Sequence, residues 1–444
     1  MKYEKIKSII LTLLVGISVF LTWNLWTYQP GYDTIDSDEA YDVSISAQKK
    51  EQELIKPYKL FYHHRNQIFG TSSEIEMDKV LTQLSSWTLF DLKDRSSEYS
   101  QTEIERIIHG ENKVELVFTD NVPLSIYGRV INLEDKKTPN VSFNRIVLDL
   151  SVSNSDTGTI YFVSYGQGKK VFLESRVDLG SIQTLEDTFV KNAIYRYDQY
   201  IKHPLNNRTI ILPKNSEEYI SFSYYTDIIP PEDFKQALFN DPNNVKKDFT
   251  KTGETYTNTN SLMEVFKENN TFSFVTPSAE TNGASSPGGL FQKSIEFVNE
   301  HGGWTDQYQY FSISPQENKI VYRLFVKNHP VFNDYGMAEI SQKWGKEAIN
   351  EYSRPYFKLE PSVVSDEKEV TLPSGASILN SLLEDDSLEP DLIEDIMIGY
   401  KLTKDTNPLN KKFVVFEPSW YYKYSGTWIR LPLNETEGLE NGLE

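Results

Sequence analysis

The stretch SIILTLLVGISVFLTWNLW, residues 8–26, decides how the rest of this chain is organised, because it is almost wholly apolar. As a helix it is long enough to cross the hydrocarbon core of a bilayer once. Three lysines stand in the seven residues before it, and no lysine or arginine follows until Lys49. The sequence therefore predicts one membrane-spanning helix near the amino terminus.

The charges on either side of this stretch predict its orientation. Basic residues next to a span stay in the cytoplasm, and the far side here carries five carboxylates between residues 33 and 42. We expect a cytoplasmic tail at 1–7, a transmembrane helix at 8–28, and the remainder outside the cell. A cleaved signal peptide would have a shorter core followed by small residues, so an uncleaved signal anchor in the cell membrane is predicted.

Composition limits what the external part can do. The net charge is −19, and removing the first seven residues leaves −21 on the remainder, a charge that repels nucleic acid. With 39% hydrophobic and 25% charged residues the chain is expected to fold rather than stay disordered. It contains no cysteine, so disulfides, thiolate metal sites and a cysteine nucleophile are excluded. An external protein without cysteine is compatible with a Gram-positive bacterial surface.

The order of helical and strand-like segments predicts an α+β fold with antiparallel sheets. A solvated acidic stalk is expected at 29–56. Three serial extracellular α+β domains then follow, at 57–180, 181–280 and 281–444. The Gly- and Ser-rich stretch from Thr276 to Gly289 is the most linker-like part of the sequence.

Local signals place the individual elements. The capping-box patterns Ser73-x-x-Glu76 and Ser100-x-x-Glu103 each predict a helix start. Further helices are expected near 182–202, 231–239, 290–300 and 375–384. Strands are expected at 113–119, 123–131, 145–152, 158–165, 169–177, 209–212, 217–226, 262–268, 271–276, 307–314, 319–327, 392–403, 412–417 and 420–431.

One catalytic pattern deserves to be weighed, that of an acyl-serine enzyme similar to penicillin-binding enzymes. Ser46-x-x-Lys49, Ser142-x-Asn144 and Lys251-Thr252-Gly253 occur in the required order. However, Ser46 falls in the predicted stalk. A second Ser-x-x-Lys pair, Ser365 and Lys368, indicates that such short matches arise by chance. We expect no catalytic residues, and therefore a protein that is not an enzyme.

Cofactor and metal motifs give no positive signal. The six histidines, His63, His64, His109, His203, His301 and His329, lack zinc spacing, and adjacent His63 and His64 are expected on opposite sides of a strand. No phosphate-binding Gly-x-x-x-x-Gly-Lys loop occurs, and the acidic clusters lack EF-hand spacing. We expect neither a cofactor nor a metal site.

The predicted membrane helix carries a stripe of small and polar residues. Ser8, Thr12 and Gly16 are spaced by four, and Asn24 continues the same face. Small residues at this interval let a second helix approach closely, and a buried amide adds an interhelical hydrogen bond. The stripe is a hypothesis for helix–helix interaction, and the alternative is that these residues face lipid.

The chain resembles the YycH family, external regulators of an essential bacterial two-component system that controls the cell wall. The segments that carry the resemblance span the chain: MKYEKIKSIILTLLV, LTWNLWTYQP, SYYTDIIPPEDFKQALFND, NEHGGWTDQYQY, YSRPYFKLEP, LPSGASIL, IEDIMIGYKLT and EPSWYYKYSGTWIRL. The resemblance implies a single-span protein with three external domains. It also implies action with a related membrane protein, YycI, on the sensor histidine kinase WalK, and it brings no catalytic residues.

These observations predict a non-enzymatic membrane-anchored regulator, with its amino terminus in the cytoplasm. A third possibility is a binding module for a cell-wall ligand. Its first candidate site is the aromatic cluster Trp420, Tyr421, Tyr422, Tyr424 and Trp428, although alternating strand residues also explain these aromatics. The sign of the effect on the kinase and the stimulus stay open.

Overall fold

The computed structural model describes residues 14–18, 45–134, 138–151, 157–166, 170–205, 208–279, 285–346, 348–405 and 412–432, with 361–366 described by backbone only. The chain divides into two units, 1–42 and 43–444.

In the first unit, residues 14–18 are helical, and the rest of the predicted transmembrane helix at 8–28 lies outside the described residues. Of the interaction stripe only Gly16 is described, while Ser8, Thr12 and Asn24 are not. Among the described residues, no helix combines the length and the apolar character that crossing a membrane requires. The anchor therefore stays a prediction.

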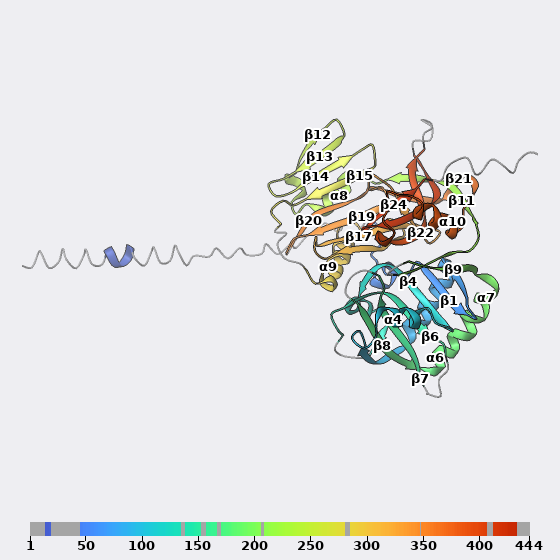
Figure 1. The fold of residues 1–444 in the computed structure, drawn as a ribbon. Coiled ribbons are helices and arrows are strands. Elements are labelled where there is room, and N and C mark those ends of the chain that lie inside the picture. The colour runs from blue at the N-terminus through green and yellow to red at the C-terminus, as the bar shows by residue number, and fades with distance from the viewer. Residues whose placement is uncertain are drawn as a thin grey trace, which may run out of the picture. The chain divides into compact units, whose positions relative to one another are not determined.

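The first ten strands of the second unit form one sheet within the described residues, in the order β10-β9-β2-β1-β4-β6-β7-β8-β3-β5. Figure 1 labels β1, β4, β6, β7, β8 and β9 of this sheet. All neighbours are antiparallel except the short pair β3–β5. The strands are β1 (Lys59–His64), β2 (Gln67–Thr71), β3 (Thr88–Asp94), β4 (Lys113–Pro123), β5 (Asn132–Leu133), β6 (Ser142–Asp149), β7 (Thr157–Ser164), β8 (Val171–Asp178), β9 (Asp198–Pro204) and β10 (Thr209–Pro213).

The remaining strands form a second sheet, in the order β12-β13-β14-β15-β20-β19-β17-β18-β22-β23-β11-β21, with β16 paired to β17 and β24 to β23. Within this second sheet, only β18–β22 is parallel among the pairs that the structure describes. The strands are β11 (Glu217–Ile228), β12 (Lys246–Phe249), β13 (Gly253–Thr257), β14 (Leu262–Phe266), β15 (Thr271–Val275), β16 (Tyr308–Ser314), β17 (Lys319–Val326), β18 (His329–Phe332), β19 (Glu339–Trp344), β20 (Ile349–Pro355), β21 (Phe357–Leu372), β22 (Ile393–Lys404), β23 (Phe413–Tyr424) and β24 (Thr427–Leu431).

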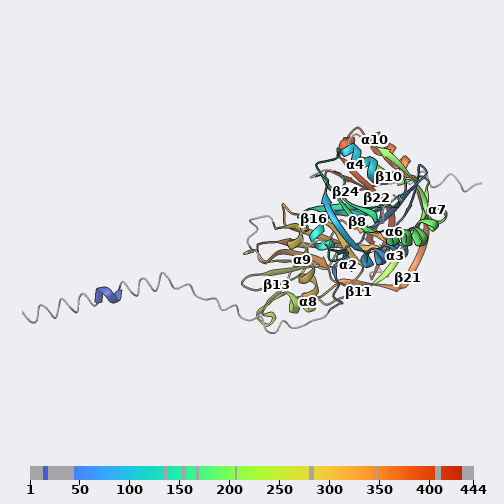
Figure 2. The ribbon, with the colours of Figure 1, turned by 90° about the horizontal axis from the view of Figure 1, so that it is seen from below.

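Helices cover both sheets. In the first sheet α3 and α6 pack on one face, and α4 packs on the other against Val147, Val163 and Phe172 (Figure 2). The helices are α2 (Glu51–Leu54), α3 (Glu74–Ser86), α4 (Gln101–Ile108), α5 (Leu124–Tyr127), α6 (Leu179–Leu185), the π-helix η1 (Glu186–Val190), α7 (Lys191–Arg196), α8 (Pro231–Leu238), η2 (Pro242–Asn244), α9 (Pro287–Glu300), α10 (Gly375–Leu383) and η3 (Pro390–Leu392).

The predicted helix starts are correct at both capping-box patterns. At α4 the full box forms, because the Glu103 N–H donates to Ser100 Oγ and the Ser100 N–H donates to Glu103 Oε2. Ser73 begins α3 but makes no side-chain cap, and the reciprocal bond is also absent because Glu76 bonds Lys79 and Tyr197 while the Ser73 N–H donates to Thr71 Oγ1. A correct start therefore needed only the local sequence, whereas the capping bonds depended on tertiary neighbours.

Several predicted strands and helices need correction. The strand expected at 123–131 is instead the helix α5, because Pro123 ends β4 and the apolar residues after it pack on α9. The helix expected at 182–202 stops at Arg196, and β9 follows. The strands expected at 412–417 and 420–431 have different bounds in the structure. β23 continues through Pro418 to Tyr424, and β24 begins at Thr427 after the turn at Ser425.

The predicted stalk at 29–56 also extends too far, since its described part, 45–56, is packed. The Trp304 N–H donates to the Ala47 carbonyl at 3.0 Å, and Asn299 exchanges hydrogen bonds with the Lys49 backbone at 3.0 Å. Leu54 in α2 is fully buried. Residues 45–50 and the loop 299–306 together form what we call the N-terminal clamp.

Strand pairing crosses the predicted domain boundaries. β9 and β10 lie beyond residue 180, yet β9 pairs with β2 in the first sheet. β11 to β15 lie before residue 281 and pair within the second sheet. The α9 helix starts inside the expected linker, at Pro287. The three-domain division stays a prediction, because sheet membership alone does not define a domain.

Candidate functional site

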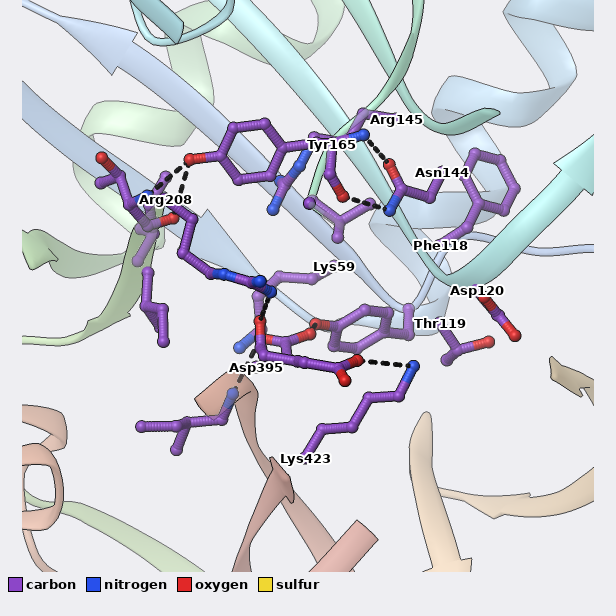
Figure 3. A pocket seen from close by; sticks show the side chains of 18 of the residues that line it. Lys59, Phe118, Thr119, Asp120, Asn144, Arg145, Tyr165, Arg208, Asp395 and Lys423 are labelled. Atoms are coloured by element: carbon purple, nitrogen blue, oxygen red, sulfur yellow. Dashed lines mark hydrogen bonds and ion pairs between the residues drawn. The ribbon is translucent and has the colours of Figure 1, made fainter. Parts of the chain in front are cut away.

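A polar cavity of about 100 Å³ lies where β1, β4 and β10 of the first sheet meet β22 and β23 of the second (Figure 3). Its lining combines basic, acidic and aromatic side chains. These are Tyr58, Lys59, Phe118, Thr119, Asp120, Asn144, Arg145, Tyr165, Arg208, Glu394, Asp395 and Lys423, among others. We call it the inter-sheet pocket.

Lys59 is the most deeply buried amine of the inter-sheet pocket. It is only 8% exposed, and its Nζ lies 5.1 Å from the centre of the Tyr200 ring. Burial lowers the pKa of Lys59, although Glu217 and Asp395 oppose that shift. Contact with an aromatic face partly compensates a cation for its lost hydration.

The carboxylates of the pocket are held by hydrogen bonds rather than left free. Asp120 accepts from the Asn121 N–H at 2.8 Å and the Ile313 N–H at 3.1 Å, and burial raises its pKa. Asp395 accepts from the Tyr58 hydroxyl at 3.3 Å. These acids are therefore structural acceptors that tie the two sheets together.

Two further contacts cross or brace the pocket. Asn144 and Tyr165 exchange a reciprocal pair of hydrogen bonds at 2.8 Å, visible as dashed lines in Figure 3. Arg208 Nη1 donates to the Glu394 carbonyl at 2.9 Å, which links the start of β10 to β22. Burial raises the pKa of Tyr165 to about 12, so its hydroxyl is a poor base or nucleophile. The hydrogen bonds of the inter-sheet pocket therefore connect the two sheets, and its lining suits binding of a polar group rather than covalent chemistry.

The residues of the acyl-serine pattern are separated by the fold. Ser46 Oγ donates to the Trp304 carbonyl at 2.5 Å, and Lys49 Nζ donates to the Asp306 carbonyl at 2.9 Å. Asn144 lies in the inter-sheet pocket, whereas Gly253 opens β13 in the second sheet. An acyl-serine enzyme needs the lysine beside the serine hydroxyl. Here both side chains are used by the N-terminal clamp.

The predicted aromatic cluster splits into two groups. Tyr421 and Trp428 line a second cavity of about 830 Å³ together with Arg323, whose guanidinium carbon lies 4.5 Å from the centre of the Phe332 ring. The alternate residues Trp420, Tyr422 and Tyr424 instead pack in the core beneath α10. Strand alternation accounts for this division, since neighbouring side chains point to opposite faces.

The residues of the inter-sheet pocket were not identified from the sequence. Lys59, Arg208 and Asp395 are far apart in the chain and follow no spacing that a motif search can detect. Only the pairing of β1 with β4 and the contact between β10 and β22 bring them together. A single sequence carries no local signal for such a site.

Comparisons with known proteins agree with this fold. The family model described as the YycH protein N-terminal domain matches residues 4–193, and that of the C-terminal domain matches residues 207–438. A Bacillus subtilis (strain 168) relative, "Two-component system WalR/WalK regulatory protein YycH", is 26% identical over 467 residues and covers 100% of both chains. The crystal structure of YycH from Bacillus subtilis superposes with a TM-score of 0.73 at 22% identity, covering 87% of this chain and 98% of that chain. The chain belongs to the YycH family.

Proposed function

We propose that this protein is a non-enzymatic regulator of a WalK-type sensor histidine kinase, held in the cell membrane by one helix. The observation that carries the proposal is the full-length similarity to a protein named as a regulator of the WalR/WalK system. The regulator would act together with a YycI-like membrane protein, as the family resemblance implies. Two-component output would then depend on how these chains pack against the kinase.

The proposed topology places residues 1–7 in the cytoplasm, 8–28 in the bilayer and the folded body outside. The lysines before the apolar stretch and the carboxylates after it support this orientation. The strongly negative body would also be repelled by anionic lipid headgroups, so it is expected to stand off the membrane surface. Contact with the kinase would then involve the helix and partner proteins rather than lipid.

The N-terminal clamp supports coupling between the body and the helix. Lys49 is fixed by Asn299 and Asp306, so the chain leaving the body toward residue 43 starts from a defined anchor point. A change in the loop 299–306 would therefore move residues 45–50, from which the chain continues toward the predicted membrane helix. Coupling of this kind needs two arrangements of the membrane helices with different kinase output, typically separated by a few kcal/mol.

The helix stripe Ser8, Thr12, Gly16 and Asn24 is the proposed contact face. Replacing Gly16 with Leu would add a large side chain where a partner helix approaches, and we expect it to change kinase output. The matched control is Ser18→Leu, because residue 18 lies about 200° around the helix from residue 16. Both variants leave the external body unchanged, and a WalR-dependent reporter at equal expression measures the effect. Equal output from Gly16→Leu and wild type would contradict the stripe.

Because the chain has no cysteine, cross-linking can test the contact directly. Single cysteines at Gly16 and at Ser18 are paired with a cysteine scan of the partner kinase helix in native membranes. We expect disulfide formation from Gly16→Cys and little from Ser18→Cys. Co-purification of a chain whose residues 8–28 are replaced by an unrelated membrane-spanning helix provides the second arm. Retention of the kinase and the YycI-like protein by that chain would place the contact in the external body instead.

A further inference from the structure

Two histidines and a glutamate converge in the core of the first sheet, and none of the three lines the inter-sheet pocket. His63 lies on β1, His109 follows α4, and Glu115 lies on β4. Their exposed fractions are 3%, 8% and 0%. His109 Nδ1 lies 2.7 Å from Glu115 Oε1, and His63 Nε2 makes a short contact to the same oxygen.

The opposite oxygen of Glu115 is fixed from the other side. Arg145 Nη1 donates to Glu115 Oε2 at 3.0 Å, which leaves Oε1 directed at the two imidazoles. A group that holds the second oxygen of a carboxylate orients it for one-oxygen coordination. The cluster therefore presents two nitrogens and one oxygen to a common point.

Hydrogen bonding within the cluster is incomplete. Although both imidazoles bond Glu115, His63 Nδ1 and His109 Nε2 are buried and have no hydrogen-bond partner among the described residues. These are the ring nitrogens opposite to the ones that face Glu115 Oε1, so they would not coordinate an ion bound there. The second nitrogen of a metal-bound histidine usually donates to a further group or to water. Both histidines also line a cavity of about 390 Å³, which offers a route for a small ion or water.

We propose that His63, His109 and Glu115 bind a divalent transition-metal ion, with Zn²⁺ the best chemical match. Two imidazoles and one carboxylate form a known zinc ligand set, with the fourth position left to water. The three ligand atoms lie within 4.8 Å of one another. Both nitrogens are hydrogen-bonded to Glu115 Oε1, so they must give up these bonds and move apart to admit an ion at zinc bond lengths of about 2.0–2.2 Å.

The charge around the cluster is mixed. Arg145 and Lys202 oppose a bound cation, and Lys202 Nζ donates to the His109 carbonyl at 2.7 Å. Arg106 adds a further positive charge to the lining of the same cavity, and Glu105 and Glu111 offset part of the total. Because the ligands come from β1, β4 and the end of α4, a bound ion would fasten two strands of the first sheet to the helix that packs on them.

The test uses full-length protein purified in detergent, stripped with a chelator and titrated with Zn²⁺. We expect one Zn²⁺ per chain, and Glu115→Gln and His63→Gln should weaken binding by at least about 10-fold. His64→Gln is the matched control, because His64 is the next residue on β1 and lines the same cavity without joining the cluster. It should bind like wild type.

Failure of the folded wild type to bind Zn²⁺ would overturn the proposal, as would binding that is unchanged in both ligand variants. Should those variants not fold, the zinc X-ray absorption spectrum of the wild type decides. Two imidazole ligands around the zinc would support the site, and a shell of oxygen ligands alone would refute it. None of these readouts depends on kinase output, so this proposal and the proposed regulatory function can fail separately.

Discussion

Gly303→Ala is the substitution that tests the N-terminal clamp most directly. Gly303 has a φ of +69°, and a methyl carbon there would lie 2.4 Å from the Ser46 carbonyl oxygen and 2.8 Å from that of Ala47. Both distances are too short for a carbon–oxygen contact, so residues 46 and 47 must move away. That movement would break the Trp304 N–H bond to Ala47 and the Ser46 Oγ bond to Trp304.

The expected cost can be built from these parts. A non-glycine residue in the left-handed region costs about 1–2 kcal/mol, and each of the two lost hydrogen bonds contributes about 1 kcal/mol. Gly303→Ala should thus lower the free energy of unfolding by about 3–4 kcal/mol. Gly336→Ala is the matched control, since Gly336 has a φ of +75° and nothing within 4 Å of the added carbon. It should cost only about 1–2 kcal/mol.

Urea unfolding measures the total cost, and limited trypsin digestion measures release of the clamp. A difference of about 2 kcal/mol between the two variants corresponds to about 30-fold faster cleavage after Lys49 in Gly303→Ala, if cleavage follows the opened population. Equal stability and equal cleavage rates for Gly303→Ala and Gly336→Ala would refute the reasoning. The segment would then not be held by the close approach to Gly303.

Three shorter predictions concern charge and chemistry. Partial burial would raise the pKa of Glu254, but hydrogen bonds, led by the one from Lys247, hold this pKa at about 2. The ionised Glu254 therefore stabilises the fold above its ordinary pKa of 4.5, and this contribution is lost as the pH falls toward 2. Glu254→Gln should flatten the decline of the urea unfolding midpoint in acid. Burial raises the pKa of Asp306 to about 6, although a hydrogen bond from the Leu359 N–H opposes this shift. The stability that protonated Asp306 contributes is fully present below its ordinary pKa of 3.8 and is lost as the pH rises through 6. Asp306→Asn should therefore stabilise the protein at neutral pH and have little effect in acid. A fluorescent β-lactam should not label the wild type, and labelling that disappears in Ser46→Ala would support the acyl-serine alternative.

Elements with local signals were predictable from the sequence. The α4 helix carries its own capping box, and the helix expected near 231–239 is α8. The α5 segment was misassigned because Leu124, Ile126 and the residues around them alternate as a strand would. Its helical form depends on packing against α9, which lies more than 150 residues later in the chain. Short segments of this kind are where tertiary contacts override local preference.

The candidate sites were not predictable for the same reason. Adjacent His63 and His64 were expected on opposite sides of a strand, and β1 places His63 in the core with Glu115 while His64 stacks on Tyr62. What the pattern of histidines could not reveal is that His109, at the end of a helix, meets the same carboxylate. Metal motifs are recognised by close spacing, whereas these ligands come from three separate elements.

Under the proposed regulatory function, the path of the chain gives the clamp a place in the coupling between body and anchor. Residues 45–50 bind the loop 299–306 of the second sheet before the chain enters β1 of the first, so a load on the predicted anchor would reach the second sheet first. The bond from Arg208 to Glu394 and that from the Ile313 N–H to Asp120 connect the two sheets elsewhere. A ligand or partner that shifts either sheet could therefore bias the juxtamembrane segment through contacts that already exist. Such coupling requires the two sheets to have two arrangements of similar free energy. Loss of kinase regulation in Gly303→Ala, with regulation kept in Gly336→Ala at equal expression, is the result that this argument expects.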